Sequence, residues 1–252
     1  MTTDPAPATL HAVSAAGDEL DGRYAADAWQ AVDLGVPARR GAGAVSFTGI
    51  DPPWLREAAK RWARQCLATG CAFNTIRAGT QALKRFSGFL SQCQPPVRRP
   101  AEMDRALLER YLAWLASLPL ADSTKVLSRV FLRSFLEDNR RYHWVPGIPP
   151  EATLYHDEIS ARRRSLPRFI PEFVMNQLES GDNLAQLHPT YRGLVVLITE
   201  TGLRVGDACM LPFDPVLTDS AGWPCLRFTS SKMRAEQLVP LSTRAVTAVR
   251  EQ

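Results

Sequence analysis

The stretch Thr201-Gly202-Leu203-Arg204-Val205-Gly206-Asp207 is the most informative part of the sequence. It follows an apolar segment, residues 191–199, that is expected to form a helix buried on most sides. Gly202 would end this helix, because glycine enters the left-handed conformation without penalty, and a new helix is expected over 205–211. Arg204 would then stand where free backbone N–H groups and the helix dipole favour an anion. The alternative is an ordinary helix end followed by an exposed arginine.

A carboxylate and a lysine extend this pattern. Asp207 lies one helical turn after Arg204, where it would orient the guanidinium or pair with a neighbouring helix. Residues 225–229 and 237–241 are expected to be two short strands, with Lys232 at the turn between them. A lysine in a turn is by itself most often a solvated residue. Its interest lies in the order of the elements: an arginine at a helix start, then a hairpin lysine, then a helix that Ser242 would cap.

Upstream, apolar residues recur at three- and four-residue steps and predict four amphipathic helices. These begin at residue 51, at 74 or 75, after 104, and at 122 or 123, and together they describe a compact helical domain over 51–144. The residues expected to face inward from the last three helices are Ile76, Leu83, Phe86, Phe89, Leu90, Leu107, Leu108, Tyr111, Leu112, Leu115, Val126, Leu127, Val130, Phe131 and Phe135.

Composition divides the rest of the chain. Residues 1–50 are rich in Ala, Gly, Asp and Pro, and we expect a flexible N-terminal arm there. Prolines and the absence of a clear period predict a linker over 145–168. A second domain would then occupy 169–252. The apolar content of 45% fits a protein with a real core, and no apolar run is long enough to cross a bilayer, so we expect a cytoplasmic protein.

Positive charge is concentrated in the middle of the chain. Residues 51–168 contain 20 basic and 11 acidic side chains, a net charge of +9, whereas residues 1–50 carry −3 and residues 169–252 carry −2. Such asymmetry suggests a polyanionic partner, although a solvated basic surface would look the same. The candidate DNA-binding residues are Arg56, Lys60 and Arg64 on the first helix, Arg77, Lys84 and Arg85 on the second, Lys125, Arg129 and Arg133 on the fourth, and Arg162, Arg163 and Arg164 in the linker.

The cysteines and histidines indicate no metal or redox site. None of the five cysteines forms a Cys-x-x-Cys pair, and the four histidines are scattered without metal-ligand spacing. We therefore expect reduced thiols, no metal and no small-molecule cofactor.

The two motifs resemble those of tyrosine recombinases, the phage-integrase superfamily. Residues 201–207 are similar to the family's first catalytic-arginine motif, in which Thr-Gly-x-Arg is followed by a carboxylate three residues after the arginine. Residues 231–241 look like its β-hairpin, with a lysine and a closing Val-Pro-Leu. The segment 166–171 and the pattern Lys-Met-x-x-Glu are most similar to the corresponding sequences of transposon-encoded integrases. The resemblance covers about residues 51–252.

The resemblance implies a mainly α fold. A helical, SAM-like core-binding domain that forms half of a clamp on duplex DNA would precede part of an α+β catalytic domain with a small β-hairpin. Arg204 would bind the scissile phosphate and stabilise the transition-state charge, Lys232 would donate a proton to the leaving 5′ oxygen, and Asp207 would support them from behind.

The family also uses a His-x-x-Arg motif, a further His or Trp, and a tyrosine that forms a covalent 3′-phosphotyrosine. No histidine or tyrosine follows Lys232, and Tyr191 is expected to be a buried structural residue. We therefore expect the chain as given to be catalytically incomplete, with part of the catalytic domain missing.

Three functions fit these observations. The leading one is a site-specific recombinase or integrase that binds double-stranded DNA and self-associates on it when full length. The second is a non-catalytic, integrase-derived protein that occupies or regulates recombination sites. The third is a helical interaction protein with an incidental basic surface, which predicts no salt-dependent DNA binding.

Overall fold

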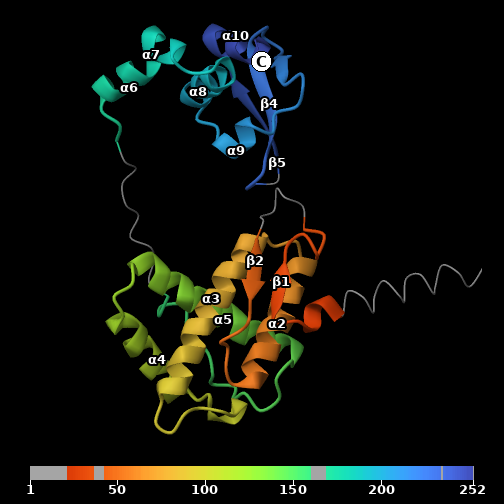
Figure 1. The fold of residues 1–252 in the computed structure, drawn as a ribbon, viewed down its shortest axis with the longest axis vertical. Helices are drawn as coiled ribbons and strands as arrows, with labels where there is room; N and C mark the ends of the chain where they lie inside the picture. Colours follow the sequence, from red (N-terminus) through yellow and green to blue (C-terminus); the bar gives the residue numbers. More distant parts are fainter. Residues whose placement is uncertain (1–21, 37–42, 160–168, 234, 252) are drawn as a thin grey trace, which may run out of the picture. The chain divides into compact units, whose positions relative to one another are not determined.

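A computed structural model describes residues 22–36, 43–159, 169–233 and 235–251. The chain divides into two compact units, residues 1–164 and 165–252. Each unit is built mainly from helices and contains one small antiparallel sheet (Figure 1). The mainly α fold predicted from the sequence is confirmed. No helix in the described part of the chain is long and apolar enough to span a bilayer.

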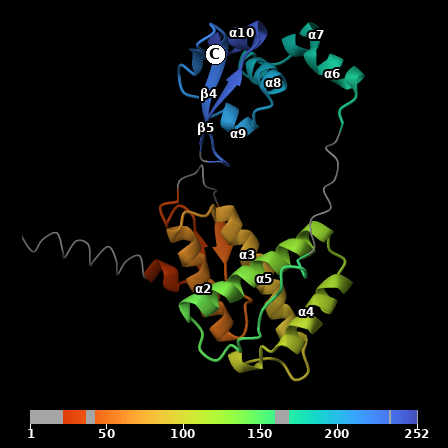
Figure 2. The ribbon, with the colours of Figure 1, turned by 180° about the vertical axis from the view of Figure 1, so that it is seen from behind.

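Four long helices form the body of the first unit. They are α2 (Pro53–Ala68), α3 (Phe73–Gln92), α4 (Arg105–Ser117) and α5 (Asp122–Tyr142), with a short 3-10 helix, η2 (Pro100–Glu102), before α4. Local sequence sets their starts: a proline opens α2, and the Asp104 carboxylate accepts a hydrogen bond of 2.7 Å from the Leu107 N–H. In Figure 2, α5 crosses α2 and α3, and it packs against both. All four predicted helices are confirmed.

The core of the first unit confirms most of the predicted inward faces. Every residue predicted to face inward from α3 is buried, as are four of the five from α4. For α5 the prediction is partly wrong, because Leu127 and Val130 are 36% and 38% exposed. Leu132 and Leu136 face inward in their place. Apolar residues lie on more than one face of α5, so its packing on α2 and α3, rather than its own sequence, decides which face is buried.

Part of the predicted N-terminal arm is built into the first unit. β1 (Ala28–Gln30) pairs antiparallel with β2 (Ala44–Ser46). Trp29 and Phe47 are buried, with ring centroids 4.6 Å apart, in the same core as the helices. The flexible-arm prediction is therefore wrong for the described part of residues 1–50. Three-residue strands carry almost no periodic signal, which is why the sequence did not reveal them.

The described part of the predicted linker, residues 145–159, packs on the first unit. Ala152 and Leu154 are buried, and Arg105 of α4 donates a 3.0 Å hydrogen bond to the Thr153 carbonyl oxygen. The linker prediction is therefore wrong for these residues, because backbone without a regular period can still bury apolar side chains. Arg162, Arg163 and Arg164 lie outside the described residues.

The second unit packs helices against a three-stranded sheet. Its helices are α6 (Glu172–Glu179), α7 (Gly181–Ala185), α8 (Pro189–Thr201), α9 (Val205–Ala208) and α10 (Thr243–Arg250). Its strands are β3 (Val216–Thr218), β4 (Pro224–Ser230) and β5 (Ala235–Pro240), in the antiparallel order β3-β4-β5. The β4–β5 hairpin and helices α8 and α10 confirm the predictions. The short elements α7 and β3 were not predicted, and α9 ends earlier than expected.

The prediction for α8 is wrong in its burial. Val196 and Leu197 are its buried residues, and Tyr191 in its first turn is 62% exposed rather than buried. Apolar composition does not determine how many neighbours cover a helix. Here α7, α9 and α10 contact α8 and leave the side chain of Tyr191 open.

Candidate functional site

Gly202 turns the chain from α8 into α9 and so places Arg204. Its φ of +67° is left-handed, and its N–H donates a hydrogen bond of 2.9 Å to the Ile198 carbonyl oxygen. Arg204 follows in an extended conformation as the N-cap of α9, while the preceding Leu203 is buried. The Arg204 side chain remains 57% exposed. The turn therefore presents the guanidinium to solvent from a fixed backbone.

Asp207 connects this turn to the β4–β5 hairpin. It is 3% exposed, and one carboxylate oxygen accepts hydrogen bonds from the Ser231 N–H at 3.0 Å and from the Ser231 hydroxyl at 2.6 Å. The Arg204 guanidinium lies farther away, 3.7 Å from the other carboxylate oxygen. Asp207 therefore contacts Arg204, as its position in the motif suggested, but Ser231 is its main partner.

These contacts lower the pKa of Asp207. The hydrogen bond from the Ser231 hydroxyl has the largest effect, the Ser231 backbone N–H comes next, and the charge of Arg204 adds to both. Burial acts in the opposite direction and is outweighed. The buried group is therefore a carboxylate anion at neutral pH.

Lys232 directly follows Ser231 at the turn of the hairpin. The two strands are paired as far as Ser230 and Ala235, and the Ser230 hydroxyl accepts a 3.4 Å hydrogen bond from the Met233 N–H. Lys232 is exposed and has no hydrogen-bond or ion-pair partner among the residues that the structure describes. One buried carboxylate thus joins the arginine turn to the lysine turn and leaves both cationic side chains accessible.

This arrangement suits a phosphate ester. A guanidinium can bind two phosphate oxygens at once, and an ammonium group can donate a proton to a departing oxygen. In the described ranges, no group of three or more His, Cys, Asp or Glu side chains is placed to hold a metal ion.

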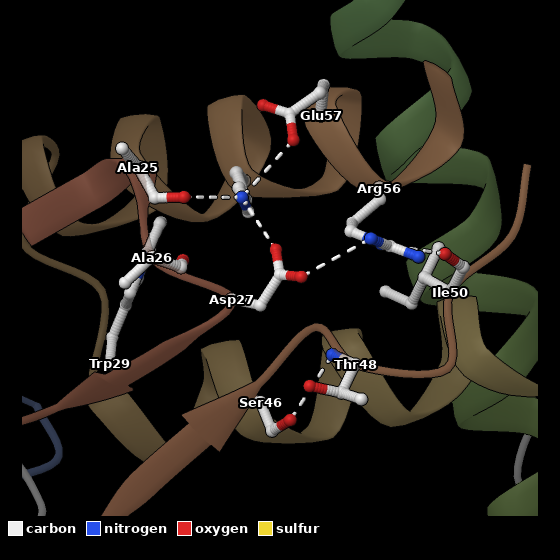
Figure 3. A network of polar contacts seen from close by, with 10 residues as sticks. Ala25, Ala26, Asp27, Trp29, Ser46, Thr48, Ile50, Arg56 and Glu57 are labelled. Carbon is white, nitrogen blue, oxygen red and sulfur yellow. Dashed lines mark hydrogen bonds and ion pairs between the residues drawn. The ribbon is translucent and has the colours of Figure 1, made fainter. Parts of the chain in front are cut away.

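The basic stripe of α2 is occupied by contacts inside the first unit, and Figure 3 shows Arg56 of this stripe beside Asp27. Lys60 is 7% exposed, and its ammonium group bonds the Asp27 carboxylate at 2.7 Å, the Ala25 carbonyl oxygen at 2.7 Å and Glu57 at 3.2 Å. Arg56 donates to the same Asp27 at 3.3 Å. These two cations lower the pKa of Asp27, chiefly through the hydrogen bond from Lys60.

The third residue of that stripe has a similar role. The Arg64 guanidinium lies over the ring of Tyr24, 4.8 Å from its centroid. The basic side chains of α2 therefore hold the segment that leads into β1 against the helix. A contact between buried Lys60 and DNA has no support in this geometry.

The basic residues of α5 are partly engaged. Lys125 donates to the Ala116 carbonyl oxygen at 2.6 Å, Arg129 to the Glu158 carbonyl oxygen at 3.0 Å, and Arg133 to the Glu137 carboxylate at 2.6 Å. Lys125 and Arg129 thus contact neighbouring segments, whereas the contact of Arg133 with Glu137 lies within α5, and none of the three is buried.

The basic residues of α3 are less engaged than those of α2 or α5. Arg85 donates a 3.3 Å hydrogen bond to the Ser128 hydroxyl. Arg77 is exposed, and its donation to Asn74 at 3.3 Å lies within the same helix. Lys84 is half-buried and has no polar partner within the described ranges.

Ser231 is the site residue that sequence reasoning missed. A serine beside a turn lysine carries no signal of its own. Its partner Asp207 precedes it by 24 residues in another element, and only the packing of α9 against β4 brings the two together.

Comparison with solved structures identifies the fold. It is similar to the XerH site-specific recombinase bound to palindromic difH substrate in a post-cleavage complex, with a TM-score of 0.55 and 14% identity over 81% of this chain and 62% of that one. The pre-cleavage complex of XerH with difH substrate gives a TM-score of 0.50 and 13% identity over 81% and 61%. The fold is that of tyrosine recombinases.

Comparison of sequences points to transposon-encoded proteins. The chain is 27% identical over 206 residues to transposase B from transposon PsiTn554 of Staphylococcus aureus. It is also 27% identical over 198 residues to transposase B from transposon Tn554 of S. aureus strain N315. These alignments cover 82% and 79% of this chain but 32% and 31% of the relatives, so the chain spans about a third of their length. No family model matches. The resemblance to transposon-encoded tyrosine recombinases is confirmed.

Proposed function

We propose that this chain acts in site-specific DNA recombination of the tyrosine recombinase type, binding duplex DNA so that strands are cut and rejoined through a 3′-phosphotyrosine. The observation that carries the proposal is the link from Asp207 to Ser231. It joins two motifs that a phosphoryl-transfer site needs together, the arginine turn and the lysine hairpin. The likeness to the XerH complexes and to the two transposases supports the same function.

In this proposal the two cations act on different oxygens of one phosphodiester. Arg204 binds the non-bridging oxygens and stabilises the charge that develops on them. As the attacking tyrosine oxygen forms its bond to phosphorus, the bond from phosphorus to the 5′ oxygen breaks, and Lys232 gives its proton to that oxygen. Asp207 touches neither oxygen and positions both motifs. The attacking tyrosine is not assigned to any residue of this chain.

The first unit supplies the proposed duplex-binding surface. Residues 51–164 of this unit contain 19 basic and 11 acidic side chains, a net charge of +8, while residues 1–50 carry −3. Side chains that neutralise phosphates release counterions and gain free energy. We assign the contacts to α3 and α5, because Lys60 of α2 is enclosed by its own partners. The assigned residues are Arg77, Lys84, Arg85, Lys125, Arg129 and Arg133. We further propose that the protein meets its DNA in the cytoplasm and self-associates on it.

Salt-dependent binding to random-sequence duplex DNA tests the proposal. We expect the logarithm of the affinity to fall with the logarithm of salt concentration with a slope steeper than about −3, since each phosphate contact contributes about −0.9. Arg77→Glu with Lys84→Glu should weaken binding at least about tenfold and flatten the slope by about 2. Fluorescence anisotropy of a labelled duplex measures both quantities.

A matched control separates a local contact from net charge. Arg98→Glu with Arg110→Glu makes the same change in charge at two exposed positions of the same unit, and should affect binding far less. Equal losses from both pairs, or binding that does not depend on salt, would contradict the proposal and favour a helical interaction protein.

A nicked suicide duplex tests the assignment of the catalytic residues. We expect no covalent adduct with this chain, because neither motif contains a tyrosine. A covalent adduct mapped to the exposed Tyr191, or to another tyrosine of this chain, would overturn the proposal that none of the chain's tyrosines is the attacking residue.

A further inference from the structure

Two of the five cysteines lie close together where helix α2 ends. Cys66 belongs to the last turn of α2, and Cys71 lies in the connection that leads into α3. Both side chains are half-buried, and neither is part of a disulfide. Because four residues separate the two cysteines in the sequence, they do not form a Cys-x-x-Cys motif. Their proximity follows from the way in which the helix ends.

A Schellman motif closes α2 and brings the two cysteines together. Gly70 follows the C-cap residue Thr69 and takes the left-handed conformation, with a φ of +79°. Its N–H donates to the Leu67 carbonyl oxygen at 2.9 Å, and the Cys71 N–H donates to the Cys66 carbonyl oxygen at 2.9 Å. These two hydrogen bonds define the motif, in which the side chains of the first and last residues commonly touch. Here the first and last residues are Cys66 and Cys71.

The two thiols interact across this turn. Burial raises the pKa of the Cys66 thiol to about 12, and the electrostatic interaction and hydrogen bond with the Cys71 thiol raise it further within that shift. The Cα atoms of residues joined by a disulfide lie about 4 to 7 Å apart, a separation that a direct backbone hydrogen bond also gives. A disulfide between the two cysteines is therefore compatible with the turn.

We propose that Cys66 and Cys71 are a redox-responsive pair, which a small disulfide oxidant such as oxidised glutathione converts into an internal disulfide. The Cys71 thiol loses its proton and attacks one sulfur of the oxidant, so a disulfide forms between Cys71 and glutathione, and one glutathione thiolate leaves. The Cys66 thiol then loses its proton and attacks the Cys71 sulfur, and the second glutathione thiolate leaves. The cysteine pair gives up two electrons, and the oxidant is reduced to two molecules of glutathione.

The surroundings of each sulfur set the order of these steps. The thiolate is the form that attacks a disulfide, and the raised pKa of Cys66 keeps its thiol protonated at neutral pH. Cys71 lies beyond the helix end, in the connection to α3. Cys71 therefore reacts first with the external oxidant, whereas Cys66 reacts with a sulfur that already lies beside it.

Mass spectrometry after treatment with oxidised glutathione tests the pair. Trypsin releases both cysteines in one peptide, residues 65–77. In the wild-type chain this peptide should become lighter by two hydrogen atoms, and dithiothreitol should restore both thiols. In Cys66→Ser, glutathione should stay on Cys71, because no second thiol displaces it. Cys93→Ser changes another half-buried cysteine of the same unit and should leave the oxidation of the peptide unchanged.

The disulfide should also raise the melting temperature of the first unit. It closes a six-residue loop and so restricts the unfolded chain, which gives an increase of about 2 °C or more. Tryptophan fluorescence during heating measures the increase, because the first unit holds most of the tryptophans. Treated Cys66→Ser should show no such increase.

Two outcomes would overturn the proposal. The first is a wild-type peptide 65–77 that keeps glutathione, or keeps both thiols free, under a treatment that modifies the exposed Cys209. The second concerns the order of the steps. If Cys66 in Cys71→Ser took up glutathione as fast as Cys71 does in Cys66→Ser, Cys71 would not be the residue that attacks the oxidant first.

Discussion

The buried carboxylate of Asp207 accepts two hydrogen bonds from Ser231, the residue directly before Lys232. The same carboxylate lies 3.7 Å from the Arg204 guanidinium. It therefore fixes the lysine turn more firmly than it fixes the arginine. A change at either end of this contact should loosen the hairpin turn and thereby move Lys232 relative to Arg204.

Ser231→Ala should destabilise the second unit. The variant loses a hydroxyl that donates to a buried anion at 2.6 Å, and such hydrogen bonds contribute about 1 to 3 kcal/mol. Hydrogen exchange of the β4 and β5 amides measures the loss. Ser220→Ala removes an exposed hydroxyl from the same unit and should change the free energy of unfolding by less than about 0.5 kcal/mol. Equal exchange rates in the two variants would show that the Asp207 contact is not stabilising.

Acid should remove the contribution of Asp207. Its pKa is lowered in the folded protein, so the unfolded chain binds a proton at higher pH than the folded chain does. The stabilisation is therefore complete above the ordinary carboxyl pKa and is lost as pH falls through the lowered value. The difference in unfolding free energy between wild type and Asp207→Asn should shrink from about pH 6 to about pH 3. Urea unfolding at both values measures it, and a constant difference would contradict the assignment.

Gly202→Ala should strain the turn that carries Arg204. Gly202 has a φ of +67°, which costs a residue with a Cβ atom about 1 to 2 kcal/mol. Gly206→Ala is the control, because its new Cβ would meet nothing within 4 Å and Gly206 lies within helix α9. We expect a lower melting temperature for the first variant and an unchanged or higher one for the second. Equal melting temperatures would mean that the turn tolerates a side chain.

Lys60 and Lys84 should separate stability from DNA binding. Lys60→Met leaves the Ala25 carbonyl oxygen and Asp27 without their main donor, and should cost about 1 to 3 kcal/mol. Lys84→Met should change stability by less than about 0.5 kcal/mol but reduce the salt slope of DNA binding by about 1. Tryptophan fluorescence during urea unfolding reports on the first unit, which holds five of the six tryptophans. If Lys84→Met lowered the stability and Lys60→Met reduced the salt slope instead, the assignment of Lys60 to stability and of Lys84 to DNA binding would be wrong.

The sequence by itself determined the long helices of the first unit and the order of the two motifs. Apolar periodicity placed α2 to α5, and local signals such as Asp104 and Gly202 marked where helices begin and end. These features act over a few residues, so they can be read from neighbouring positions. The arginine and lysine motifs were recognisable for the same reason, since each is a short contiguous stretch.

Only the tertiary structure decided which polar residues face a ligand. Lys60 and Lys84 both lie in basic stripes with helical spacing, yet Lys60 is enclosed by Asp27 and Ala25 from a segment that the sequence marked as flexible. Ser231 and Asp207 form a hydrogen bond although they are 24 residues apart in the sequence. A charged side chain has the same local pattern whether its partner is water, a phosphate or a distant carboxylate. The difference arises only when packing brings that partner within hydrogen-bonding distance.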